Sequence, residues 1–283
     1  MSMILPMLAL FLQSDLPVPK ASEPAITVTG RRADRSVSDR AVRNVITPSR
    51  NGQIARFEDP LCPAVIGINP STARGITSLI KTNASEAGAR VAGRQCQINA
   101  LVVVTSSPKG FIEAVLAAQP MTTATIDKSR LRWLKESDAP IRSWQVTAVE
   151  DRNGVPLIGN DSGPTINPLT SVSRLVATTR EAMVKSIVVL DVGSMDGKTV
   201  RQIADITTLH LLLNIAPDAG DRSVESILAL FDRSVAPQEM TPFDRGLLAG
   251  LYTPPTNAVT AGETRRRIRR TLTRGRGYAA DQK

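Results

Sequence analysis

The chain has 283 residues and an apolar content of 42%, enough to bury the core of one medium domain with flanking segments. Its formal net charge of +9 would suit a nucleic-acid-binding protein if the charge were spread over that domain. One histidine and two cysteines exclude a zinc site built from several imidazoles, and the sequence has neither a Walker-type phosphate loop nor a G-x-G-x-x-G motif.

The positive charge lies in two flanking segments. Residues 261–283 hold seven arginines and one lysine against two carboxylates, and residues 31–44 hold five arginines against two carboxylates. The rest of the chain is neutral in sum. The basicity therefore belongs to the flanks and not to the predicted core.

The chain begins with a short apolar run, residues 1–12, which a polar, proline-containing stretch follows. A run of this length is too short to span a bilayer as a helix but fits the core of a signal peptide. We therefore expect residues 1–25 to be a signal peptide and the protein to be periplasmic or secreted. No Lys or Arg precedes the run and no clear Ala-x-Ala site follows it, so a buried N-terminal helix in a cytoplasmic protein stays open as the alternative.

Residues 26–53 are rich in Arg, Asp and Ser, a composition typical of a flexible basic linker. Ordered structure is expected from Ile54, in a single domain over residues 54–256. Its first part alternates helices and strands. Helices are expected at 70–87, 111–118 and 127–134, and strands at 100–105, 142–149 and 186–191. One face of the second helix is apolar and consists of Phe111, Ala114, Val115 and Ala118.

A long exposed loop is expected before the last of these strands. Residues 158–170 are rich in Gly, Asn, Asp, Ser and Pro, and residues 171–177 then read as a further strand. The stretch 180–185 fits either a helical turn or a β connection.

The last third of the domain is predicted to be helical, with helices at 200–211, 224–231 and 241–252. The last of them has Thr241 as N-cap, proline at its first position and Asp244 to complete a capping box. The whole pattern predicts an α+β fold with a mixed central sheet, helices packed on it and a C-terminal helical portion. Residues 257–283 are expected to form a basic, disordered tail.

Cys62 and Cys96 are the only cysteines. Behind a signal peptide, two cysteines favour an intramolecular disulfide. Such a bond would place the turn at Cys62 beside the residues that lead into strand 100–105. Two free, buried thiols are the alternative.

His210 is expected to be a partly buried residue near the end of helix 200–211, where a cation is favoured. No carboxylate lies three or four residues from it to orient the imidazole. Four aspartates are interpreted as turn and cap residues and not as an acid–base pair: Asp161, Asp191, Asp196 and Asp205. We therefore predict no catalytic residue, no metal ligand and no cofactor.

The strongest charge feature is an arginine cluster in the tail. It consists of Arg265, Arg266, Arg267, Arg269, Arg270, Arg274 and Arg276. These side chains could contact the phosphates of nucleic acid or an anionic membrane surface. Only Tyr278 interleaves with them, so single-strand recognition lacks its usual stacking partners. The alternative is a solvated tail that aids solubility.

Several segments resemble a family of exported bacterial proteins of unknown function. They are Phe57–Gly67, Cys96–Asn99, Gln202–Asp205, Thr241–Asp244 and Leu251–Tyr252. The late helices are also similar to zincin-like metalloprotease domains, where an H-E-x-x-H helix precedes an Asp-containing helix that ends in Leu-Tyr. The helix at Gln202–Asp205 has no such motif, so the resemblance implies a domain without the zinc ligands and without the protease activity.

The leading functional hypothesis is an exported, non-catalytic α+β protein of the cell envelope that acts as an interaction module. A second hypothesis is a hydrolase-type enzyme whose carboxylates and hydroxyls lie near loop 158–170. A third is a cytoplasmic basic protein that binds nucleic acid through its arginine-rich tail.

Overall fold

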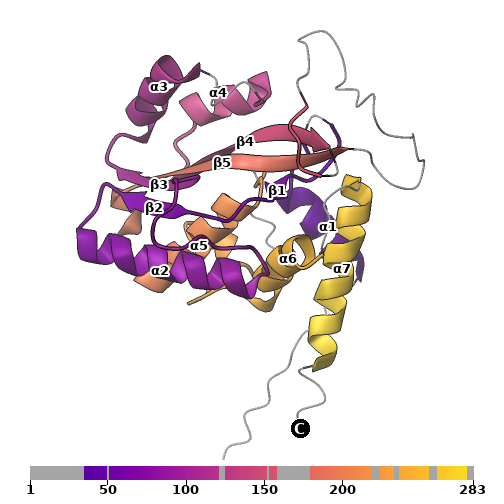
Figure 1. Ribbon diagram of the computed structural model, residues 1–283. Helices are drawn as coiled ribbons and strands as arrows, with labels where there is room; N and C mark the ends of the chain where they lie inside the picture. The colour runs from indigo at the N-terminus through magenta and orange to yellow at the C-terminus, as the bar shows by residue number, and fades with distance from the viewer. Residues whose placement is uncertain are drawn as a thin grey trace, which may run out of the picture. The chain divides into compact units, whose positions relative to one another are not determined.

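The computed structural model (Figure 1) describes residues 35–49, 51–120, 125–151, 153–157, 179–217, 219, 224–232, 236–254 and 260–278, and the side chains among these from Asp39 to Thr273. The signal peptide expected at 1–25, the loop at 158–170 and the strand at 171–177 lie outside the described residues. Every described element belongs to one folded unit, Ala33–Lys283.

A five-stranded sheet forms the centre of this unit. Its strands are β1 (Arg56–Phe57), β2 (Pro63–Ile66), β3 (Ala100–Thr105), β4 (Ile141–Asp151) and β5 (Thr179–Asp191). β4 runs antiparallel to β5 along one edge, β1 and β3 pair parallel with the other edge of β5, and β2 pairs parallel with β3. The mixed central sheet predicted from the sequence is confirmed.

β3 and the second half of β5 form the buried middle of the sheet. Val102 and Val188 face each other across the two strands and are fully buried. Nearly continuous β-branched runs are typical of parallel strands that are covered on both faces. Residues 180–185 belong to β5. Of the two structures that the sequence allowed for this stretch, a helical turn or a β connection, the β connection is correct.

Helices α2 (Pro70–Glu86) and α5 (Val200–Leu212) cover one face of the sheet (Figure 1). α5 is buried along its length from Gln202 to Leu212, because α2 packs beside it and α6 (Pro242–Tyr252) contacts it as well. The capping box that Thr241 forms at the start of α6 is present as predicted. These helices and the sheet enclose the larger hydrophobic core.

Two shorter helices, α3 (Pro108–Ala118) and α4 (Lys128–Glu136), pack on the opposite face. They cover a second, smaller core around Trp144 of β4. Its buried members are Ile112, Leu134, Trp144, Ile187 and Val189. The sheet therefore has a thick helical layer on one face and a thin layer on the other.

The expected disordered tail is instead a packed helix, α7 (Ala261–Tyr278). Ile268 and Leu272 are buried against α6, where Gly246 and Gly250 allow the two helices to approach closely. Two apolar residues four positions apart share one helix face, which is enough to anchor α7. The arginines around them hid this short apolar stripe in the sequence.

The expected flexible linker is also partly helical. Val45 at the end of α1 (Arg35–Val45) is buried. The next residue, Ile46, forms an antiparallel bridge with Ile215, which follows α5 in the sequence. Order therefore begins well before Ile54. α1 contacts α7 and lies beside it in Figure 1, so the two basic flanks of the sequence come together in the fold.

The helix predicted at 224–231 is only a single 3₁₀ turn, η3 (Ile227–Ala229). Ile227 and Leu230 are buried, which explains the apolar pattern. The backbone N–H of Ile227 donates to the carboxylate of Asp244 on α6, at 2.9 Å. This contact with a neighbouring element fixes the start of a short turn.

Candidate functional site

The disulfide predicted from the two cysteines is present. Cys62 and Cys96 are bonded, and their Cα atoms are 6.0 Å apart. Asn99 supports the same link, because its Oδ1 accepts from the Cys62 N–H at 2.7 Å and its Nδ2 donates to the Pro60 carbonyl at 3.1 Å. The segment before β3 is therefore fixed to the residues that precede β2.

His210 lies inside the fold. Its Nδ1 is 2.9 Å from the hydroxyl oxygen of Ser143 on β4, and Ser143 is fully buried. Burial, with a smaller contribution from Arg130, lowers the pKa of His210 to about 3. The imidazole is therefore neutral near pH 7, so the expectation of a cation at this helix end was wrong. Burial outweighs the attraction of the helix end for a positive charge.

Asp205 connects three parts of the fold. Its carboxylate accepts from Asn83 of α2 at 2.8 Å and from the Met240 N–H at 2.7 Å, and it forms an ion pair with Arg201 at 3.1 Å. Asp205 is fully buried in the middle of α5. It is a cross-link between helices, and the interpretation as a turn or cap residue was wrong for this position.

Two of the other aspartates fit the interpretation as turn and cap residues. Asp191 ends β5 and accepts a hydrogen bond from Ser194 at 2.8 Å, and Asp196 follows the 3₁₀ turn η2 (Gly193–Met195) as its C-cap. Asp161 lies outside the described residues.

Asp244 has a structural role that its capping box only partly revealed. Besides the N–H and hydroxyl of Thr241, it accepts from the Ser226 hydroxyl and the Ile227 N–H. Burial raises the pKa of Asp244 above its usual value, although each of these hydrogen bonds acts in the opposite direction.

The turn between β5 and α5 lies at the carboxyl ends of parallel strands, where open α/β sheets commonly bind ligands. Here the start of α5 is already capped. The Thr199 hydroxyl accepts from the Gln202 N–H at 3.1 Å, and the Gln202 side chain accepts from the Thr199 N–H at 3.0 Å. Because these two N–H groups have partners within the helix, we place no ligand at this turn.

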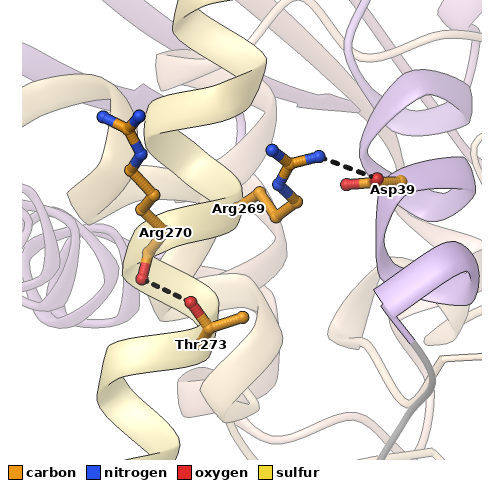
Figure 2. Close-up of a pocket in the computed structure, with 4 residues that line it drawn as sticks. All are labelled: Asp39, Arg269, Arg270 and Thr273. Atoms are coloured by element: carbon orange, nitrogen blue, oxygen red, sulfur yellow. Dashed lines mark hydrogen bonds and ion pairs between the residues drawn. The ribbon is translucent and has the colours of Figure 1, made fainter.

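The arginine cluster predicted in the tail is divided between paired and unpaired side chains. Arg269 forms an ion pair with Asp39 of α1 at 3.0 Å, as Figure 2 shows. Glu263 is shared by Arg266 at 2.6 Å and Arg267 at 3.7 Å.

The remaining members of the cluster differ in their surroundings. Arg265 donates to the Ile46 carbonyl at 3.3 Å. The guanidinium of Arg270 points away from α1 in Figure 2, and it forms no ion pair with any described residue. The side chains of Arg274 and Arg276 lie outside the described residues.

An apolar groove of about 480 Å³ lies between α3 and the sheet. We call it the α3 groove. Its apolar walls come from α3, β3, β5 and the segment before β3, and they are formed by Ile98, Leu101, Phe111, Ala114, Val115, Ala118 and Ile187. Ile98 is 51% exposed. A large apolar side chain left in water beside other apolar groups is typical of a binding surface.

Three polar residues border the α3 groove: Asn99, Gln119 and Lys185. The amide of Asn99 is already bonded to the disulfide region. Lys185 is exposed on β5 and forms no ion pair with any residue that the structure describes. It is the cationic group among the residues that line the groove.

Lys185 lies at one end of the groove. Lys185 and Ile187 are two positions apart on β5, so their side chains point to the same face of the sheet. The N–H of the intervening Ser186 donates to the Asn99 carbonyl at 2.8 Å. The lysine is therefore at the end of the groove that borders Asn99.

The sequence located one wall of the α3 groove but not the groove itself. Phe111, Ala114, Val115 and Ala118 do share one face of α3, as predicted. Ala114 and Ala118 are exposed, so the neighbouring elements leave part of this face uncovered. The available signal was the size of the two alanines, which are too short to fill the space above the sheet.

No family model, curated protein or solved structure matches this chain. The resemblance to exported zincin-like proteins stays a prediction. Within the described part of the chain, no helix is both long and apolar enough to cross a membrane. Among the same residues, no three His, Cys, Asp or Glu side chains are grouped so that they could hold a metal ion.

Proposed function

We propose that this protein is an exported, non-catalytic binding protein of the cell envelope, and that its ligand is an anionic single-chain amphiphile such as a long-chain fatty acid. The observation that carries the proposal is the α3 groove, with apolar walls and Lys185 at one end. Small-molecule sites commonly have volumes of about 300–1,000 Å³, apolar walls and a few polar groups that orient the ligand.

The apolar chain of the ligand would lie over Leu101, Phe111 and Ile187. Each methylene group removed from water contributes about 0.8 kcal/mol. A chain of several methylenes can therefore supply most of the binding free energy. It would also cover Ile98, whose exposure in the free protein is unfavourable.

The carboxylate of the ligand would lie beside Lys185. This ammonium group is exposed, so the ion pair would contribute at most about 1 kcal/mol. Its main effect is therefore on orientation: the charged group stays in water at the Asn99 end, and the chain extends along α3.

Other contacts support the exported and non-catalytic parts of the proposal. A structural disulfide is typical of proteins that mature in an oxidising compartment. His210, Asp205 and Asp244 are the residue types most used in acid–base catalysis, and here they are buried in hydrogen bonds between structural elements.

Filling the groove tests the proposal. The wild-type protein is expected to bind 11-(dansylamino)undecanoic acid with a rise in dansyl fluorescence, and palmitate should displace the probe. Ala114→Trp places an indole in the groove and should raise the dissociation constant about tenfold or more, a loss of about 1.4 kcal/mol. Ala117→Trp is the matched control, because Ala117 is exposed on the same helix and does not line the groove.

The outcomes separate cleanly. If the wild-type protein does not bind the probe, the proposal is wrong. It is also wrong if the protein binds the probe but palmitate does not displace it. If both tryptophan variants weaken binding equally, the amphiphile binds elsewhere and the α3 groove is not its site. Circular dichroism of both variants confirms that each remains folded.

The charged end of the ligand is tested by Lys185→Met. We expect a loss of up to about fivefold in affinity for palmitate, since an exposed ion pair contributes at most about 1 kcal/mol. Affinity for hexadecanol, which has the same chain and no charge, should not fall. Lys135→Met on α4 is the control, because Lys135 is exposed and does not line the groove.

A further inference from the structure

We infer that α1 and α7 together form a second binding surface, and that its partner is an anionic lipid bilayer. The surface consists of Arg43 of α1 and of Arg265, Arg266, Arg269 and Arg270 of α7. We call it the arginine face. It shares no residue with the α3 groove, so the inference does not depend on the proposed ligand.

The packing of α7 turns Arg266 and Arg270 outward. Ile268 is fully buried and Leu272 nearly so, against the glycines of α6. Positions 266 and 270 lie on the opposite side of the same helix. The side chain of Arg266 is 59% exposed. A helix fixed on one side by apolar contacts therefore holds its charged side toward solvent.

Contacts between the helices bring a further arginine to this surface. Asp39 of α1 pairs with Arg269, which aligns the two helices (Figure 2). Arg43 is exposed one turn after Asp39. It lies close enough to Arg265 to lower the pKa of that guanidinium, after the larger effect of burial. Two like charges are therefore held near each other.

The acidic groups nearby neutralise only part of this charge. Asp39 pairs with Arg269, and Glu263 is shared between Arg266 and Arg267. Arg270 and Arg43 form no ion pair with any described residue. Arg270 also borders a hollow of about 360 Å³ with Asp39, Arg269 and Thr273, but its guanidinium points away from α1 (Figure 2) and is exposed. Partner phosphates would replace the missing anions.

A bilayer fits this surface better than nucleic acid does. Among the described residues, no aromatic side chain stands between these arginines to stack on a base. Each basic residue close to an anionic membrane contributes about 1 kcal/mol, and the attraction needs no shaped site. Exposed guanidinium groups on two adjoining helices meet that requirement.

Co-sedimentation with vesicles tests the inference. The full chain is expected to bind vesicles of equal parts phosphatidylglycerol and phosphatidylcholine at about 50 mM salt, and to be released at about 500 mM, where charges are screened over a few ångströms. Vesicles of phosphatidylcholine alone should not bind it. The triple variant Arg43→Gln, Arg266→Gln and Arg270→Gln should bind at least about tenfold more weakly.

The matched control carries the same loss of charge elsewhere. It is Arg74→Gln, Arg94→Gln and Arg132→Gln, three exposed arginines on other parts of the described surface. This control should bind like the wild type. If both triple variants lose the same amount of vesicle binding, only the net charge of the protein matters and the inference of an arginine face is wrong.

Two further outcomes also overturn the inference. One is the absence of binding to phosphatidylglycerol vesicles at low salt. The other is binding of a single-stranded oligonucleotide without binding of vesicles, which would assign the face to nucleic acid. Ala114→Trp should leave vesicle binding unchanged, so failure at the groove and failure at the arginine face can be distinguished.

Discussion

At the scale of single residues, burial decides what the one histidine does. His210 lies near a helix end, where the helix dipole favours a positive charge. Loss of solvent around the imidazole has the opposite and larger effect, and its pKa falls to about 3. The neutral ring joins Ser143 of β4 to α5. The sequence identified the position of His210 along its helix but not which forces act on it.

The buried imidazole predicts a pH-dependent stability. The pKa of His210 is about 3 in the folded chain and about 6.5 when unfolded, so between these values the unfolded chain binds the extra proton. The free energy of unfolding should therefore fall as the pH falls from 6.5, by about 1.4 kcal/mol per pH unit. Its contribution is fully present above pH 6.5.

The variant His210→Gln isolates this contribution, because glutamine keeps a hydrogen-bonding side chain and does not titrate. The free energy of unfolding is measured with urea at pH 7 and at pH 5. Between these two values it should fall by about 2 kcal/mol more in the wild type than in the variant. His210 is the only histidine in the chain, so no other imidazole contributes. An equal pH dependence in the two proteins would contradict a neutral, buried imidazole.

At the scale of elements, the contact between α6 and α7 depends on two glycines. A Cβ atom on Gly250 would lie 2.5 Å from the Cα of Ile268, and one on Gly246 would lie 2.4 Å from a methyl carbon of Leu272. The first of these neighbours is backbone, which cannot move without a shift of the helix. Gly250 is therefore the position where α7 is least able to adapt.

The variant Gly250→Ala should destabilise the fold although alanine favours helices. The clash should cost about 1–3 kcal/mol, partly offset by up to about 1 kcal/mol of helix propensity. We expect a net fall in melting temperature measured by circular dichroism. Gly93→Ala is the control, since no atom lies within 4 Å of a Cβ at that position. A Gly250→Ala variant as stable as the control would show that α7 is not packed on α6.

The elements that the sequence predicted correctly are those whose own residues determine them. β3 ends in four β-branched residues, Val102 to Thr105, and the capping box at Thr241 is encoded within four residues. α1 and α7 were missed because their few apolar side chains gain stability only from α6 and from the segment after α5. Charge composition alone could not reveal that these partners exist. The α3 groove was missed for a related reason. A groove forms where no other element packs over part of a helix face, and this depends on the arrangement of the whole fold.

At the scale of the whole molecule, the disulfide joins the core to the α3 groove. Cys62 precedes β2, and Cys96 lies two residues before Ile98, which forms a wall of the groove. Asn99 donates to and accepts from the same region. The bond therefore restrains a segment that would otherwise border the groove as an exposed loop. If the proposed function is correct, the redox state of the two cysteines therefore affects ligand binding as well as the stability of the fold.

The double variant Cys62→Ala and Cys96→Ala separates these effects. The bond spans 34 residues, and a loop of that length is expected to contribute about 3–4 kcal/mol, mainly by restricting the unfolded chain. Guanidinium unfolding should show this loss. If the proposed function is correct, affinity for the dansyl fatty acid should also fall under conditions where the variant is fully folded, because the Ile98 wall is less fixed. A folded variant with unchanged stability would show that the disulfide does not restrain the chain, whereas reduced stability with unchanged affinity would show that the groove is shaped by α3 and the sheet alone.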